Sequence, residues 1–120
     1  MTNYEINKML IEKFPEFKEK YDDAILLGDG DDSSLYTTFA FVVAVALEEL
    51  TASLPSTGEK IKEIFNFLDF SIDNHDEAED VVECCVLEYL YLGKYNLKDL
   101  YPYMSDRIKN MANVFYKNGG

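Results

Sequence analysis

The sequence predicts an all-α fold: a single-domain bundle over residues 1–120, with five to six helices around an apolar central helix at about residues 34–51. Three observations predict it. A chain of 120 residues is long enough for one domain with its own core, but not for two. Its apolar content of 48% is too high for a disordered chain. Between groups of turn-forming residues, apolar side chains recur every three to four positions, as on one side of a helix.

The first predicted helical segment covers about residues 3–26. Ile6, Leu10 and Phe14 follow helical spacing along it. Pro15 disfavours helical conformation at the residue before it. We therefore expect two short helices here, or one helix with a kink.

The second predicted segment is the central helix, which begins at Ser33 or Ser34 because either hydroxyl can cap a helix. Its β-branched content also permits a buried strand, but eighteen residues is far longer than an ordinary strand. Apolar residues occur nearly all round the helix, so we expect other helices to surround it. Its main apolar stripe is Leu35, Phe39, Val42, Ala46 and Leu50.

Three more helical segments complete the predicted bundle. The third begins at a predicted capping box, in which Ser56 and Glu59 satisfy each other's backbone N–H groups. The fourth has Asn74 as its cap and ends near Gly93. The last covers about residues 97–116, with Pro102 in its first turn. The apolar stripe of the fourth segment is Ala78, Val81, Val82, Cys85, Tyr89 and Leu92.

The chain is strongly acidic, with a net charge of −12. This charge argues against binding to nucleic acid or to anionic lipid, because both need clustered lysine and arginine. Most of the negative charge lies between residues 21 and 93, in two dense clusters. These acids are either solvated turns and helix starts that keep the protein soluble, or an anionic surface that attracts a basic partner. The clusters are Asp22, Asp23, Asp29, Asp31 and Asp32, and Asp69, Asp73, Asp76, Glu77, Glu79, Asp80 and Glu83.

No segment of the sequence indicates a membrane protein or a secreted one. The longest apolar run has nine residues, 39–47, whereas a bilayer span needs about twenty. The first residues lack the apolar stretch of a secretory signal, and the two cysteines are neighbours that cannot join distant parts of the chain. We therefore expect a cytoplasmic protein.

The residues that could carry chemistry form no catalytic or metal-binding pattern. Segments 29–40 and 69–80 resemble calcium loops in part, but neither has glycine at the sixth position or glutamate at the twelfth. Neighbouring residues on an α-helix point about 100° apart, so we expect the thiols of Cys84 and Cys85 not to converge on one ion. His75 is expected to be a solvent-facing turn residue. We expect no metal, no cofactor and no enzymatic activity.

One stretch of the sequence resembles a known kind of protein. Residues 64–68 (Ile-Phe-Asn-Phe-Leu), the acidic turn at 73–82 and Leu-Glu-Tyr-Leu at 87–90 resemble a family of small, acidic, all-helical bacterial proteins of unknown function. These proteins look like the immunity proteins of bacterial toxin systems. The resemblance implies a protein that protects its cell by binding a toxin.

The predicted function is therefore non-enzymatic protein binding, in its most concrete form an immunity-type inhibitor of a basic toxin. Exposed tyrosines add contact area at such surfaces. The alternatives are a homo-oligomeric scaffold or regulatory domain that uses the tyrosine-rich C-terminal third, an enzyme with an acidic metal site, and a calcium-responsive domain. The predicted partner-binding residues are Asp31, Asp32, Asp73, Asp76, Glu77, Asp80, Tyr91 and Tyr95, the last two expected at the surface.

Overall fold

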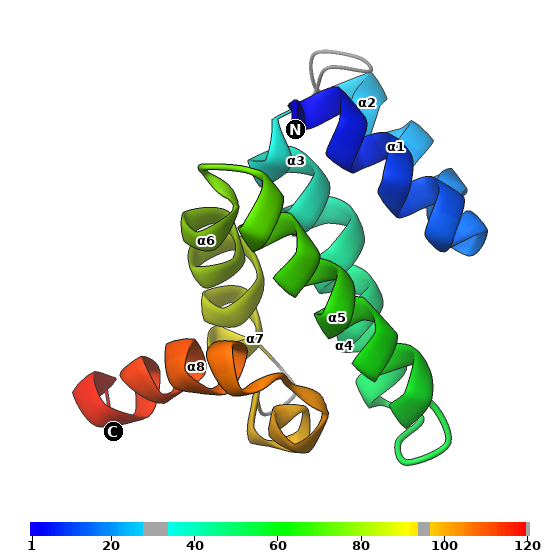
Figure 1. Ribbon diagram of the computed structural model, residues 1–120. Coiled ribbons are helices and arrows are strands. Elements are labelled where there is room, and N and C mark those ends of the chain that lie inside the picture. Colours follow the sequence, from blue (N-terminus) through cyan, green and yellow to red (C-terminus); the bar gives the residue numbers. More distant parts are fainter. Residues whose placement is uncertain (28–33, 94–96, 120) are drawn as a thin grey trace.

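Helices make up most of the part of the chain that the structure describes. The computed structural model describes residues 1–27, 34–93 and 97–119, and no strand occurs within these ranges. The radius of gyration is 13.5 Å, close to the value of about 14 Å for a compact chain of this length. The predicted all-α bundle is confirmed (Figure 1).

The N-terminal part forms two helices, α1 (Asn3–Lys13) and α2 (Lys18–Leu27), joined by a 3₁₀ turn at Pro15–Phe17. The break at the proline agrees with the sequence. A capping box starts α1: the Glu5 N–H donates to the Thr2 hydroxyl, and the Thr2 N–H donates to the Glu5 carboxylate. Both helices pack against the beginning of the central helix.

The central helix consists of α3 (Leu35–Thr38), the π-helical segment η3 (Phe39–Ala44) and α4 (Val45–Thr51). The hydroxyl of Ser34 accepts from the Thr37 N–H and caps the helix. Ser34 was one of the two predicted caps. The helix follows the predicted boundaries closely.

The next helix, α5 (Gly58–Asn74), returns alongside α4. The predicted capping box at its start is wrong. The hydroxyl of Ser56 donates to the Ser53 carbonyl and that of Thr57 donates to the Leu50 carbonyl, both over 2.6 Å. These bonds fix the turn before the helix and leave no side chain to cap α5.

A third long helix, comprising α6 (Ala78–Val81), the π-helical segment η4 (Val82–Leu87) and α7 (Glu88–Leu92), runs beside the central helix. α3 contacts α6 and η3 contacts η4, so the two helices run in the same direction. Asn74 is the last residue of α5 and not the predicted cap: its side-chain amide donates to the Phe70 carbonyl within α5, and Glu77 occupies the cap position of α6.

The π turn in this helix changes which residues face the core. Tyr89 and Leu92 were expected on the apolar stripe, but their side chains are 40% and 73% exposed, while Leu90 is buried. A π turn holds more residues than an α turn, so every side chain after it is rotated relative to an α-helical pattern. The predicted stripe residues up to Val82 are therefore buried, whereas those after η4 are exposed.

The C-terminal part contains two short 3₁₀ helices, Leu97–Asp99 and Tyr101–Tyr103, followed by α8 (Asp106–Gly119). The last α-helix thus begins at Asp106 and not at residue 97. Pro102 occupies the first turn of a 3₁₀ helix instead, which suits its missing N–H equally well.

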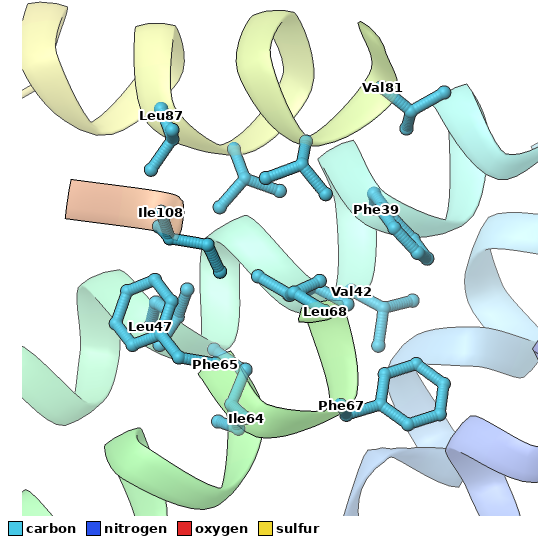
Figure 2. Close-up of a cluster of buried hydrophobic side chains, with 14 of the residues drawn as sticks. Phe39, Val42, Leu47, Ile64, Phe65, Phe67, Leu68, Val81, Leu87 and Ile108 are labelled. Carbon is cyan, nitrogen blue, oxygen red and sulfur yellow. The ribbon is translucent and has the colours of Figure 1, made fainter. Parts of the chain in front are cut away.

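The core lies where the central helix, α5 and the α6–α7 helix meet, with α8 closing one side (Figure 2). Four aliphatic side chains from the four helices meet there: Leu47, Leu68, Leu87 and Ile108 are all fully buried. Phenylalanine rings fill the remaining space; those at positions 14, 39 and 65 are fully buried.

Replacing Gly58 with alanine should destabilise the protein, although alanine is the better helix former. A methyl group on Gly58 would lie 2.6 Å from Cε1 of the half-buried Tyr103 ring, so the ring must move. We expect a loss of about 1–3 kcal/mol in the free energy of unfolding, measured by urea denaturation. In a Tyr103→Ala background the same substitution should cost nothing; an equal loss there would contradict this explanation.

Candidate functional site

One side of the central helix is left exposed by the helices within residues 1–27, 34–93 and 97–119. Phe41 is 53% exposed and Tyr36 is 42% exposed, while Thr37, Ala40 and Val45 on the same side are half-buried. Other helices pack around this helix as predicted, but they leave this one side exposed. Its neighbours, α2 and η4, pack against its flanks and leave one side open.

At one end of this open side, Tyr36 lies beside the start of α6. Partial burial raises the pKa of the Tyr36 hydroxyl, and the nearby Cys84, Asp80 and Glu77 raise it further. Glu77, Asp80 and Cys84 are three and four positions apart, so they share one face of their helix. This face is the one that borders the exposed tyrosine.

At the other end, Tyr89 of α7 lies beside Glu48 of α4. Burial and then the charge of the Glu48 carboxylate raise the pKa of Tyr89. Tyr36 and Glu48 are twelve residues apart on one helix, a distance of roughly 18 Å at 1.5 Å per residue. We call this surface the acidic–aromatic face; it consists of Tyr36, Phe41, Glu48, Glu77, Asp80, Cys84 and Tyr89.

Asp73 lies on a different side of the molecule. Its carboxylate accepts from Nη2 of Arg107 in α8 at 2.8 Å, and Nε of the same guanidinium lies 3.8 Å from Oδ1 of Asp69. The carboxylates, Asp73 first, raise the pKa of Arg107, with Glu79 adding to the effect. The second acidic cluster of the sequence is therefore divided between two faces.

The remaining predicted site residues are distributed as follows. Asp76 is exposed in the turn before α6, next to Glu77. Tyr91, expected at the surface, is half-buried, and its ring stacks on Phe115 with centroids 5.4 Å apart. Asp31, Asp32 and Tyr95 lie outside the described residues, as do Asp29 and Ser33 of the first calcium-like segment.

His75 is not the solvent-facing residue that the sequence suggested. It is half-buried: its Nδ1 accepts from the Glu77 N–H at 3.1 Å, and its Nε2 lies 2.8 Å from Oδ1 of Asn3. Because Nδ1 accepts, Nε2 carries the proton and donates to Asn3. The ring joins the start of α1 to the turn between α5 and α6.

The described residues bring no three metal-binding side chains together. No group of three or more His, Cys, Asp or Glu residues that could hold an ion occurs within residues 1–27, 34–93 and 97–119. The second calcium-like segment begins inside α5, where residues 69–74 are helical and cannot form a binding loop.

Comparison with known families gives one match for this chain. The sequence model of one family, a domain of unknown function (DUF7674), matches residues 7–118. The chain belongs to this family. No curated protein and no solved structure matches it.

The three exposed aromatic residues of the acidic–aromatic face in this DUF7674 chain were not among the predicted site residues. Tyr36 and Phe41 are not part of the apolar stripe of the central helix. Their position off the stripe was the sequence feature that could have indicated their exposure. An apolar residue off the stripe of an otherwise apolar helix is a candidate for surface exposure. No comparable signal existed for Tyr89, because only the π turn moves it outward.

The DUF7674 chain contains no helix, in the part that the structure describes, with both the length and the apolar character needed to cross a bilayer.

Titration of the tyrosines should reveal the acidic surroundings of Tyr36. Its pKa lies above the ordinary value of 10, so it should ionise later than a free tyrosine in an ultraviolet absorbance titration. A raised folded-state pKa also means that its contribution to stability is complete below pH 10 and is lost as the pH rises through the folded-state value. Asp80→Asn with Glu77→Gln should lower this pKa, whereas Glu12→Gln with Glu59→Gln should not. If both pairs of substitutions change the pKa of Tyr36 equally, Tyr36 does not lie beside Glu77 and Asp80.

Proposed function

We propose that this protein is a non-enzymatic binding protein that holds a basic protein partner on the acidic–aromatic face. One observation carries the proposal: the rings of Tyr36, Phe41 and Tyr89 are each at least 40% exposed along one side of the molecule, with Glu77 and Asp80 beside the first of them.

The aromatic rings supply the apolar part of the contact. Phe41 has no polar group that solvation would favour, so its exposure costs free energy that burial under a partner would recover. Tyrosine presents a large rigid ring with a hydroxyl at its end, and such residues are enriched where binding energy concentrates. Three exposed rings over roughly 18 Å are enough for the centre of an ordinary interface.

The carboxylates supply the preference for a positive partner. Within the described ranges neither Glu77 nor Asp80 forms an ion pair with a lysine or arginine, in contrast to Asp73. Their charges are therefore available to a partner. The net charge of −12 extends the attraction beyond the contact and should raise the association rate.

The most concrete form of this function is that of an immunity-type inhibitor, which binds a basic bacterial toxin such as a nuclease and covers its cationic site. The support is the resemblance of residues 64–90 to such proteins, together with the acidity of the chain. We place Glu77 and Asp80 in the proposed contact and leave Asp73 out of it, because the Asp73 carboxylate pairs with Arg107.

The test begins with a search for a toxin gene next to this one and continues with a binding titration against the inactivated product of that gene. Glu77→Gln with Asp80→Asn should lower the association rate about tenfold at low salt, and less at high salt, because screening removes the attraction in both proteins. Glu12→Gln with Glu59→Gln changes the net charge equally at exposed positions outside the face. If the two pairs behave alike, only net charge matters and the face is not the contact.

A second candidate function is homo-oligomerisation through the tyrosine-rich end. Leu92 is 73% exposed and Val114 is 43% exposed, and they adjoin the stacked pair Tyr91 and Phe115. These residues could form an apolar contact between two copies. Light scattering separates the candidates: a dimer that Leu92→Ser with Val114→Ser dissociates supports this one, and a monomer at high concentration excludes it.

A further inference from the structure

The sulfur atoms of Cys84 and Cys85 lie together on the surface of η4. Sγ of the exposed Cys84 is 3.6 Å from Sγ of the half-buried Cys85. The expectation that these thiols point apart is therefore wrong. Both residues lie in a π-helical turn, where successive side chains are rotated by less than in an α-helix.

This separation suits a pair of sulfurs bridged by one atom. Two thiolates bound to a tetrahedral zinc ion at about 2.3 Å lie roughly 3.8 Å from one another, close to the distance found here. A direct disulfide fits less well. Consecutive Cα atoms are about 3.8 Å apart, below the usual range of about 4.4–6.8 Å for a disulfide. The pair is therefore placed to remain a dithiol and to accept a bridging atom.

The surroundings of the two cysteines restrict which atom can bridge their sulfurs. Structural zinc needs four protein ligands, and no group of three or more suitable side chains occurs in the described part of the chain. The bridging atom must therefore need only two further bonds, which the two sulfurs supply. A trivalent arsenic atom that already carries one organic group is such an atom, because it forms just two further bonds.

We propose that Cys84 and Cys85 form a binding site for monosubstituted trivalent arsenicals. The reaction balances without a redox step. Each thiol gives up its proton, two As–S bonds form, the arsenic–oxygen double bond breaks, and the oxygen leaves as water with both protons. Arsenic stays trivalent, and the sulfurs need little movement. The site shares Cys84 with the acidic–aromatic face, but arsenical binding requires no protein partner, so the two proposals can fail separately.

The test is titration of the reduced protein with phenylarsine oxide, followed by intact mass spectrometry. The expected product is a one-to-one adduct whose mass increases by that of the reagent minus one water, with an unchanged circular dichroism spectrum. A small dithiol should remove the arsenic, whereas glutathione at an equal thiol concentration should not. Cys84→Ser and Cys85→Ser should each bind at least about 100-fold more weakly, because the second bond forms within one molecule only when both thiols are present.

Two results would overturn the proposal: a single-serine variant that binds as tightly as the unmodified chain, or no adduct on the unmodified chain. Thermal melts of both variants establish that they fold. Should either fail to fold, the unmodified protein still decides the matter, because one equivalent of arsenical must protect both thiols from a thiol-specific reagent. Protection of only one thiol would contradict bridging.

Discussion

Phe39→Ala should lower the free energy of unfolding by about 3–5 kcal/mol, whereas Phe41→Ala should lower it by about 1 kcal/mol or less. The two rings are two residues apart in one π-helical segment, yet Phe39 is fully buried and Phe41 is 53% exposed. Truncating the first leaves a cavity among packed side chains, and truncating the second removes mostly solvent-exposed surface. Urea denaturation of both variants measures the difference.

The stability of a domain of this size is about 5–15 kcal/mol, so Phe39→Ala can remove much of it. The unfolding slope with urea should stay the same in both variants if only stability changes. Equal losses for the two substitutions would show that Phe41 is covered. The open side of the central helix would then not exist.

Tyr36→Ala combined with Phe41→Ala should weaken binding of the basic partner by at least about 30-fold, equivalent to roughly 2 kcal/mol or more. The substitutions remove two of the three exposed rings that would be buried on binding. Isothermal titration calorimetry measures the loss. The heat-capacity change on binding should become less negative, since less apolar surface is buried.

Tyr4→Ala is a matched control, because Tyr4 is 45% exposed, like Tyr36, but lies on α1. It should leave affinity unchanged. If Tyr4→Ala weakens binding as much as the double substitution does, the partner contacts the α1 side and the proposed face is wrong.

The positions of the helices could be predicted from the sequence because local chemistry determines them. The spacing of Ile6, Leu10 and Phe14 is helical, Pro15 ends α1, and the Ser34 hydroxyl caps the central helix. These signals depend on side chains within four residues of one another. The capping box differed because the Ser56 hydroxyl bonds to the preceding turn, and the starts of α6 and α8 also differed from the prediction.

The two π turns could not be predicted, since nothing in the spacing of apolar residues marks η3 or η4. They face one another across the contact between the central helix and the α6–α7 helix. Their effect extends to the candidate site. One turn rotates Tyr89 outward, and the other lies where Phe41 is exposed.

The candidate site was predictable in its charge but not in its extent. The sequence indicated Glu77 and Asp80, since acidic residues gather before an apolar helix there. It could not show that Asp73 pairs with Arg107, 34 residues away, because this contact depends on how α8 crosses α5. Tertiary packing, more than local pattern, decides which carboxylates remain available.

Chemical-shift mapping of the isotopically labelled protein, titrated with the inactivated toxin, tests the central claim most directly. The account predicts that the largest shifts occur at Tyr36, Phe41, Asp80 and Tyr89, with small shifts around the Asp73–Arg107 pair. Shifts concentrated on α1 and α2, or around Leu92 and Val114, would contradict it.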